Sequence, residues 1–390
     1  MSRSGLFDFM NNDLNKLMLD MSKENHSAEE EESIKKRYSE ADNEELFRLL
    51  HEHELDGVAG NYALSLGLSL CDEWQNEYEK QKTRQEFLKQ KSEEVCKLMY
   101  ENGIRMVILK NGGIMHSMID EAVKCPMEDI DSLVSKKDFY KAHELLEKAG
   151  FVFRFRSEYE KEKLSEAFRD GSTEYYFTMP DGGEMWFELA WRPVAGRWIR
   201  LDLEPAVDDL MTRAADVKGN HVYVLSPEDN LLQVCVHTAK HSYVRAPGLR
   251  LHMDVDRIVS HNRIDWDLFL KKVKETRVKT STYLSLYIPS VIFDTEIPQY
   301  VLDELAPKNK EKLFEMLAEA GLLHPHGKKF SKLKFLGFQT ALYDSKGDIL
   351  KVIYPGKEIM QERYGCSGFF KLAGHTVARA FDLVGVRFKK

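Results

Sequence analysis

The stretch MEDIDSLV, residues 127–134, decides how the rest of the chain is interpreted. Its apolar end is typical of a buried β-strand. Asp129 and Asp131 are two residues apart, so in a strand both side chains point to the same face. Two like charges on one face repel each other and resist burial. Taken alone, such a pair at a strand edge is often simply solvated, whereas carboxylates that are brought together stay ionised only where cations neutralise them.

The residues around this stretch alternate between strand and helix signals. An amphipathic helix is predicted over 136–150, where Gly150 ends it. The sequence PDGG at 180–183 is a hairpin turn signal between two apolar segments. We predict a small mixed sheet with helices on at least one face, an α+β fold. The predicted strands are 104–110, 130–134, 151–155, 173–179 and 184–191.

Helical patterns dominate both ends of the chain. Apolar residues over 72–101 follow the stripe of one long helix, which Asn102–Gly103 would end. A capping box from Ser226 to Asp229, with Pro227 at the first helical position, opens another helix. We therefore divide the chain into three parts. These are an N-terminal helical region (1–102), an α+β palm (103–224) and a C-terminal helical region (225–390).

Composition narrows the classes of protein to consider. The 390 residues carry a net charge of −8, which argues against long nucleic acid as a substrate. No apolar run approaches the roughly 20 residues that cross a bilayer, so no membrane partner is expected. The five cysteines are widely spaced and odd in number, which favours reduced thiols and a cytoplasmic location over a disulfide framework.

A third carboxylate is expected beside the Asp129–Asp131 pair. In the segment EMWFELAW (184–191), Glu188 alternates with apolar neighbours and is free to share the face of the two aspartates. Clustered carboxylate oxygens suit Mg²⁺, or Mn²⁺ in its place, and such ions complete their shell with substrate phosphates. Gly112–Gly113 follows a predicted strand and opens a helix, where backbone amides are placed to bind a triphosphate.

Four segments in this order resemble a known family. They are ILKNGG (108–113), DIDSLV (129–134), FELAW (187–191) and SPEDNLLQVCVHTAKH (226–241). Together they are similar to the polymerase-β-like nucleotidyltransferases and, more narrowly, to the poorly characterised bacterial group called nucleotidyltransferase family proteins. The resemblance covers roughly residues 95–365.

The resemblance implies an enzyme that moves a nucleoside monophosphate from an NTP to an acceptor hydroxyl with the help of Mg²⁺. Asp129 and Asp131 take the positions of the metal-ligand pair, and Glu188 that of the third carboxylate, as a ligand or as the base for the hydroxyl. The implied phosphate-binding residues are Lys110, Gly112 and Gly113, and His237 is placed to touch the nucleotide or the acceptor. The acceptor is a small molecule, sugar, peptide or protein.

Two departures from the family pattern keep a second hypothesis open. Gly113 replaces a small hydroxyl residue, and Ala190 stands where the family has a histidine. These changes favour the alternative of a catalytically weak, nucleotide-binding accessory protein. In addition, Trp186, Trp191 and Trp198 form an aromatic group that is either core or a base-stacking surface.

A third hypothesis is a metal hydrolase. His237 and His241 lie at i and i+4 on one helix face, and this spacing can bind a transition metal. Asp254 or Asp256 would complete a His/Asp site. Histidines that hydrogen-bond at a domain junction explain the same spacing. Asp254 is also expected to pair with Arg250, four residues before it.

Overall fold

The computed structural model describes residues 5–156, 163–193, 200–364 and 371–378, and its fold is α+β. One mixed sheet has the strand order β3-β4-β5-β2-β1-β7-β6. The central strands β2 and β5 are parallel, whereas β4 pairs with β5 as an antiparallel hairpin. The strands are β1 (Val107–Ile108), β2 (Asp129–Leu133), β3 (Val152–Phe153), β4 (Ser172–Thr178), β5 (Glu184–Ala190), β6 (Ala215–Asp216) and β7 (Tyr223–Val224).

One face of the sheet is covered by helices, and the other is covered only in part. Ile130, Tyr175 and Phe187 point to the covered face and are fully buried in the main hydrophobic core. The long helix α5 (Asp72–Glu101) and α7 (Phe139–Lys148) pack there. On the opposite face, a smaller apolar cluster under α9 (Val207–Arg213) covers only the end of the sheet near Leu133. The rest of that face carries the predicted carboxylates, and we call it the open face.

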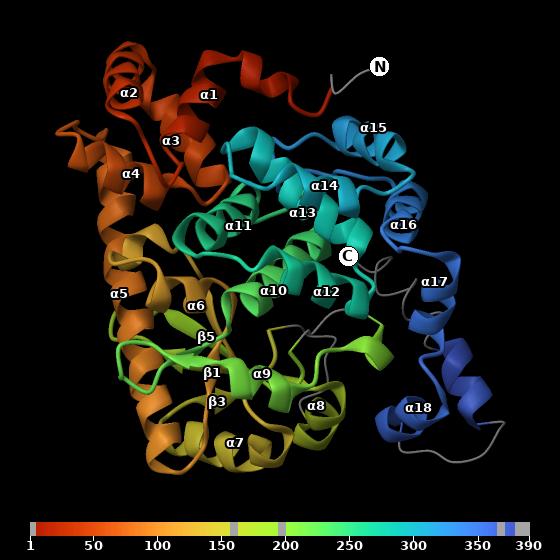
Figure 1. Ribbon diagram of the computed structural model, residues 1–390. Coiled ribbons are helices and arrows are strands. Elements are labelled where there is room, and N and C mark those ends of the chain that lie inside the picture. The colour runs from red at the N-terminus through yellow and green to blue at the C-terminus, as the bar shows by residue number, and fades with distance from the viewer. Residues whose placement is uncertain (1–4, 157–162, 194–199, 365–370, 379–390) are drawn as a thin grey trace.

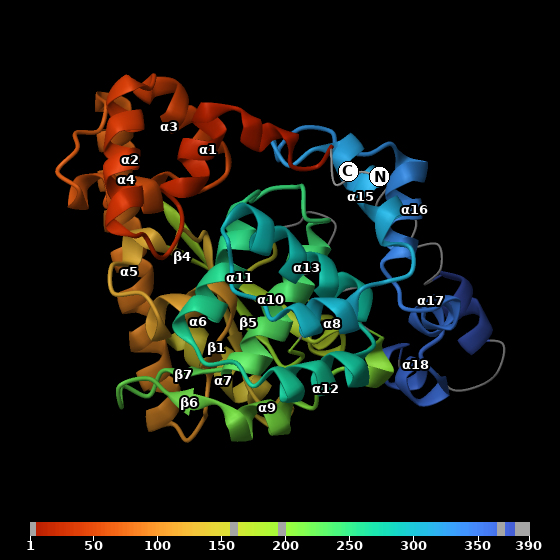
Figure 2. The same ribbon diagram turned by 45° about the horizontal axis from the view of Figure 1, so that its top comes forward.

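The N-terminal helices sit at one end of α5 (Figures 1 and 2). At the start of α2, Ser27 and Glu30 form a capping box. Gly103, with φ +74°, follows the end of α5 in the left-handed conformation that glycine adopts readily. The helices at this end of α5 are η1 (Asp8–Asn11), α1 (Asp13–Asp20), α2 (Ala28–Glu40), α3 (Asn43–Glu52) and α4 (Asp56–Ser65).

The palm helices are short and connect the strands. They are α6 (Lys110–Ser117), η2 (Ala122–Lys124), η3 (Lys136–Asp138), α7, α8 (Leu164–Asp170), η4 (Leu201–Leu203) and α9. The helical region that follows packs on α6 through α10 and α11. Its members are α10 (Pro227–Lys240), α11 (Arg250–His261), α12 (Trp266–Thr276), α13 (Lys279–Ile292), α14 (Gln299–Leu305), α15 (Lys310–Ala320), α16 (Lys332–Ala341), α17 (Lys346–Ile353) and α18 (Lys357–Tyr364).

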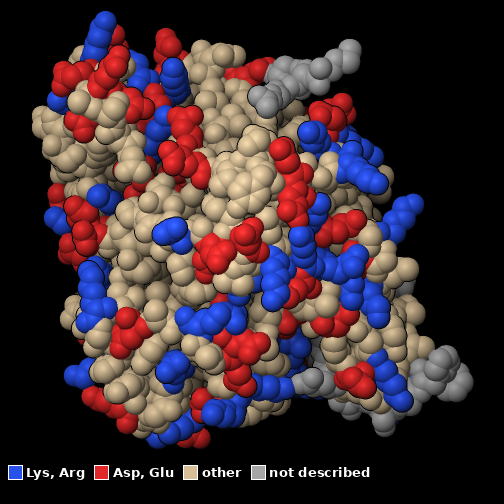
Figure 3. All heavy atoms as spheres, viewed as in Figure 1, with Lys and Arg blue, Asp and Glu red and all other residues tan. Residues whose placement is uncertain are grey.

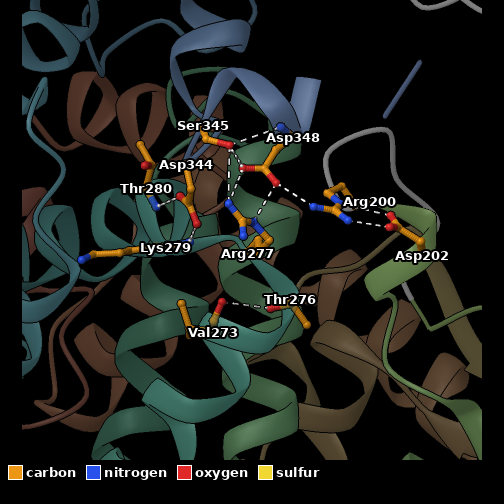
Figure 4. A network of polar contacts seen from close by, with 10 residues as sticks. All are labelled: Arg200, Asp202, Val273, Thr276, Arg277, Lys279, Thr280, Asp344, Ser345 and Asp348. Carbon is orange, nitrogen blue, oxygen red and sulfur yellow. Dashed lines mark hydrogen bonds and ion pairs between the residues drawn. The ribbon is translucent and has the colours of Figure 1, made fainter. Parts of the chain in front are cut away.

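Polar contacts attach the C-terminal helices to the rest of the molecule (Figure 4). Asp348 of α17 is 1% exposed and pairs with Arg200, beside η4, and with Arg277, at the end of α12. Asp344 accepts hydrogen bonds from the amides of Lys279 and Thr280 at 3.0 and 2.8 Å. The residue before α13 is a valine with no capping side chain, so a residue distant in sequence caps this helix.

The structure confirms the predicted α+β class and shortens some elements. Residues 104–110 contribute only the two-residue β1, because Lys110 already begins α6. Ser226 caps α10 with Pro227 at its first turn, as predicted. The three-part division stays a prediction, and residues of all three parts share one hydrophobic core. Among the described helices, none has the length and apolar character to span a membrane.

Candidate active site

Asp131 and Glu188 lie directly opposite each other on neighbouring strands. The parallel register pairs Asp131 of β2 with Glu188 of β5, and Asp129 with Trp186. Side chains paired in this way point to the same face of the sheet, so all three predicted carboxylates share its open face. Asp131 is 7% exposed and Glu188 is half-buried. The alternation of EMWFELAW, with its apolar residues on the covered face, places Glu188 as the sequence predicts.

Lys110 supplies the positive charge between this pair. Its Nζ lies 2.5 Å from Oδ1 of Asp131 and 3.9 Å from Oε2 of Glu188. Burial opposes the charge on Lys110, but the carboxylates outweigh it and raise the pKa of the lysine. The φ angle of Lys110 is +51°, an unfavourable conformation for a residue with a Cβ. Such strain is characteristic of functional sites, here at the point where β1 turns into α6.

The pKa of Asp131 reflects its buried position beside a lysine and a second carboxylate. Burial raises this pKa to about 6; Lys110 lowers it, and the neighbouring Glu188 raises it further. One lysine therefore does not fully neutralise two carboxylates in this buried setting. A hard divalent cation would supply the missing charge, and its preferred ligands are carboxylate oxygens of this kind.

Asp129 is held by a different partner, which sequence reasoning missed. Arg156, just after β3, pairs with Asp129 and with Glu174 of β4. Glu174 lies opposite Glu188 in the β4–β5 register, so a fourth carboxylate joins the same face. Alternation along TEYYFTM was the available signal for Glu174. Arg156 gives no signal of its own, because only the folding of β3 beside β4 brings it to the site.

The carboxylates fit a metal ion by their chemistry, although they do not form a closed set of ligands. Among the described residues, no three His, Cys, Asp or Glu side chains are arranged to hold a metal ion. Asp131 and Glu188 face each other, whereas the carboxylate of Asp129 is turned toward Arg156.

Close packing against β1 is sufficient to explain the glycine pair. A Cβ on Gly112 would lie 2.7 Å from Cγ2 of Ile108, and one on Gly113 would lie 3.0 Å from the Ile108 carbonyl oxygen. The amide of Gly113 already donates to the carbonyl of Leu109 at 3.1 Å. The amide of Gly113 is thus engaged within α6, and its role as a phosphate donor stays a prediction. The earlier amides of α6 have no intrahelical acceptor, and Leu109 offers no capping side chain.

Helix α10 brings two further side chains to the site. His237 is half-buried, and burial together with Lys110, His241 and Lys240 lowers its pKa well below the usual value. Lys240 is exposed, yet the surrounding protein and Lys110 lower its pKa, while the three carboxylates act in the opposite direction. Lys240 was not predicted. Its spacing of three residues from His237 was the signal available, since such residues share a helix face.

The described residues give no support to the metal hydrolase alternative. The His237 and His241 rings meet edge to face at 4.8 Å, and Nδ1 of His241 lies 2.5 Å from the Ala246 carbonyl oxygen. Asp254 pairs with Arg250 at 3.3 Å, as the sequence predicts. Asp256 accepts a hydrogen bond from Thr295. The two histidines are therefore not joined by an aspartate in a metal-binding set within the described part of the chain.

The tryptophans of the predicted aromatic group lie in different environments. Trp191 is 9% exposed and donates through Nε1 to the Phe168 carbonyl at 2.7 Å, as core residues do. Trp186 is half-buried on the open face beside Asp129. Trp198 lies outside the described residues.

Comparisons with known proteins place these features in a family. A search of curated proteins and a search of solved structures each returned no match. A protein-family model described as "Uncharacterised nucleotidyltransferase" matches residues 39–294. That range spans β1, β2, β5 and α10, and with them every candidate site residue named above from Lys110 to Lys240. Since the match covers well over half of the chain, the protein belongs to this family of uncharacterised nucleotidyltransferases.

Proposed function

We propose that the protein transfers a nucleoside monophosphate from an NTP to an acceptor hydroxyl and releases pyrophosphate. The observation that carries this proposal is the pairing of Asp131 and Glu188 across β2 and β5, with Lys110 between them. Membership of the family supports a transferase. Mixed acidic and basic side chains, with no continuous basic surface on the face in Figure 3, agree with an acceptor other than long nucleic acid.

Each residue has a defined part in the proposed reaction. Asp131, Glu188 and, once freed from Arg156, Asp129 would hold Mg²⁺ or Mn²⁺. The ion supplies activation of the attacking hydroxyl and neutralisation of the leaving pyrophosphate. Glu188 takes the hydroxyl proton as the acceptor oxygen bonds to the α-phosphorus and the bond to the bridging oxygen breaks.

The triphosphate is proposed to bind between α6 and α10. Lys110 and the uncapped first turn of α6 offer a charge and backbone amides. Lys240 offers a second ammonium, close enough to Lys110 and to the three carboxylates to respond to their charges. His237 is neutral at pH 7 because its pKa is lowered, so it is suited to a hydrogen bond with the nucleotide or the acceptor.

A nucleotide panel with one active-site variant tests the proposal. The purified protein is incubated with each of the four NTPs and Mg²⁺ or Mn²⁺. Pyrophosphate release is measured, and mass spectrometry identifies any nucleotidyl adduct. Asp131→Asn should lower the rate at least a thousandfold. The control, Glu184→Gln, changes an exposed carboxylate on the same strand and should leave the rate unchanged.

The alternatives give different results in the same assay. NTP binding without pyrophosphate release by the native protein, with any acceptor tried, would favour the accessory-protein hypothesis. Activity that survives Asp131→Asn and is lost in His237→Ala would favour the hydrolase.

A further inference from the structure

The sheet order indicates where the acceptor of the proposed reaction binds. In an in-line displacement, the attacking oxygen and the leaving pyrophosphate lie on opposite sides of the phosphorus. Lys110 and α6, the proposed triphosphate anchors, follow β1, and β2 and β5 carry the carboxylates. The order β3-β4-β5-β2-β1 then leaves the side of β4 and β3 for the acceptor.

Two aromatic rings and two arginines occupy that side of the open face. Tyr176 of β4 pairs with Trp186 of β5, which in turn pairs with Asp129, and the ring centroids of Tyr176 and Trp186 are 6.0 Å apart. The amide of Arg154 donates to the Glu174 carbonyl, which extends the β3–β4 register and places Arg154 on the same face. We call Arg154, Arg156, Tyr176 and Trp186 the acceptor platform.

The two arginines of the acceptor platform differ in their partners. The guanidinium of Arg156 lies 5.4 Å from the Trp186 ring centroid and is paired with Asp129 and Glu174. Arg154 is exposed, and its guanidinium lies 5.7 Å from the Tyr176 ring centroid. Within the described residues, Arg154 makes no ion pair, even though this part of the sheet is rich in carboxylates. Within the described part of the chain, Arg154 is therefore the cation of the acceptor platform that is left to pair with an external anion.

The chemistry of the acceptor platform selects one class of ligand. The guanidinium fork matches a phosphate or a carboxylate with two parallel hydrogen bonds. Aromatic rings beside it offer apolar area to a sugar ring or a carbon chain. A neutral alcohol would pack on the rings but would leave the guanidinium of Arg154 without an anionic partner.

The following inference rests on the proposed function. We infer that the acceptor is an anionic hydroxyl compound whose phosphate or carboxylate group binds Arg154 and Arg156. Its hydroxyl then lies toward the carboxylates. The hydroxyl oxygen bonds to the α-phosphorus of the NTP, its proton passes to Glu188, and pyrophosphate leaves. Binding of the acid group to Arg156 also competes with Asp129 for the guanidinium, which frees the third carboxylate when the acceptor is present.

Binding of three compounds with the same carbon chain tests the inference. The full-length protein is loaded with Mg²⁺ and the α,β-methylene analogue of each NTP. Glycerol 3-phosphate, glycerate and glycerol are then titrated by calorimetry, with ribose 5-phosphate and ribose as a second pair. The anionic compounds should bind at least tenfold more tightly than the neutral ones. The preference between glycerol 3-phosphate and glycerate distinguishes a phosphate site from a carboxylate site.

Two arginine variants complete the experiment. Arg154→Ala should weaken binding of the anionic compounds at least tenfold and leave binding of the NTP analogue unchanged. Arg48→Ala, which removes an exposed arginine of α3, should change neither. Equal binding of charged and neutral compounds, no binding of any anion, or full binding in Arg154→Ala would overturn the inference. If no NTP analogue binds, the proposed function itself fails.

Discussion

The contact between Glu24 and Arg257 allows a quantitative prediction for Glu24→Gln. The two side chains, 11% and 0% exposed, meet at 2.5 Å. Arg257 also donates to the Lys124 carbonyl at 2.6 Å. Burial opposes the charge on Glu24, but Arg257 and His261 outweigh it and lower the pKa of the glutamate from 4.5 to about 2. Glu24 precedes the family match, whereas Arg257 lies inside it.

The size of the effect follows from this pKa. At about 1.4 kcal/mol for each pKa unit, a shift from 4.5 to about 2 contributes about 3 kcal/mol to the free energy of unfolding at pH 7. Because the pKa is lowered in the folded state, the contribution is complete above pH 4.5 and is lost as the pH falls toward 2. At pH 3.5 it is reduced to about 2 kcal/mol.

Urea unfolding followed by circular dichroism measures the loss. Glu24→Gln should lower the free energy of unfolding by about 3 kcal/mol at pH 7, which is the range for a buried charge left without its partner. The difference should shrink at pH 3.5. Glu86→Gln, in an exposed position on α5, should cost less than about 0.5 kcal/mol. A cost below about 1 kcal/mol at pH 7, or one that does not change with pH, would contradict this account of the ion pair.

Three further substitutions test other parts of the structure. Gly112→Ala puts a Cβ 2.7 Å from a side chain of β1 and should lower the stability by about 1–3 kcal/mol in calorimetry, whereas Gly374→Ala has open space and should cost nothing. Asp348→Ala leaves two arginines without their buried partner and should lower the free energy of urea unfolding by about 2 kcal/mol. The exposed neighbour Lys346→Ala should have no effect. Lys240→Ala should weaken NTP binding about tenfold in titration calorimetry, and an unchanged affinity would remove this lysine from the proposed triphosphate site.

Local pattern was sufficient to predict the central pieces of the site. Asp129 and Asp131 share a face because strand geometry has a period of two, and the same rule applies to Glu188. The cap at Ser226 and the stop at Gly103 are equally local, because each concerns backbone groups within one helical turn. The α+β class could also be predicted from the sequence, because the periodicities of strands and helices are local patterns.

The tertiary structure alone decided which distant residues meet. The register of β2 on β5 places Glu188 opposite Asp131, although the two residues are 57 positions apart in the sequence. Arg156, Lys240 and the cap of α13 by Asp344 depend on packing between elements that no local pattern relates.

Local sequence is thus enough to specify the types of chemical groups and the faces on which they lie. Spacing along a strand or helix fixes the direction of each side chain within its own element. Only the fold decided that Lys110 lies between two carboxylates and that Arg156 holds the third. Those contacts arise from the strand order and from how α6 and α10 pack, which reflect hydrophobic burial over the whole chain.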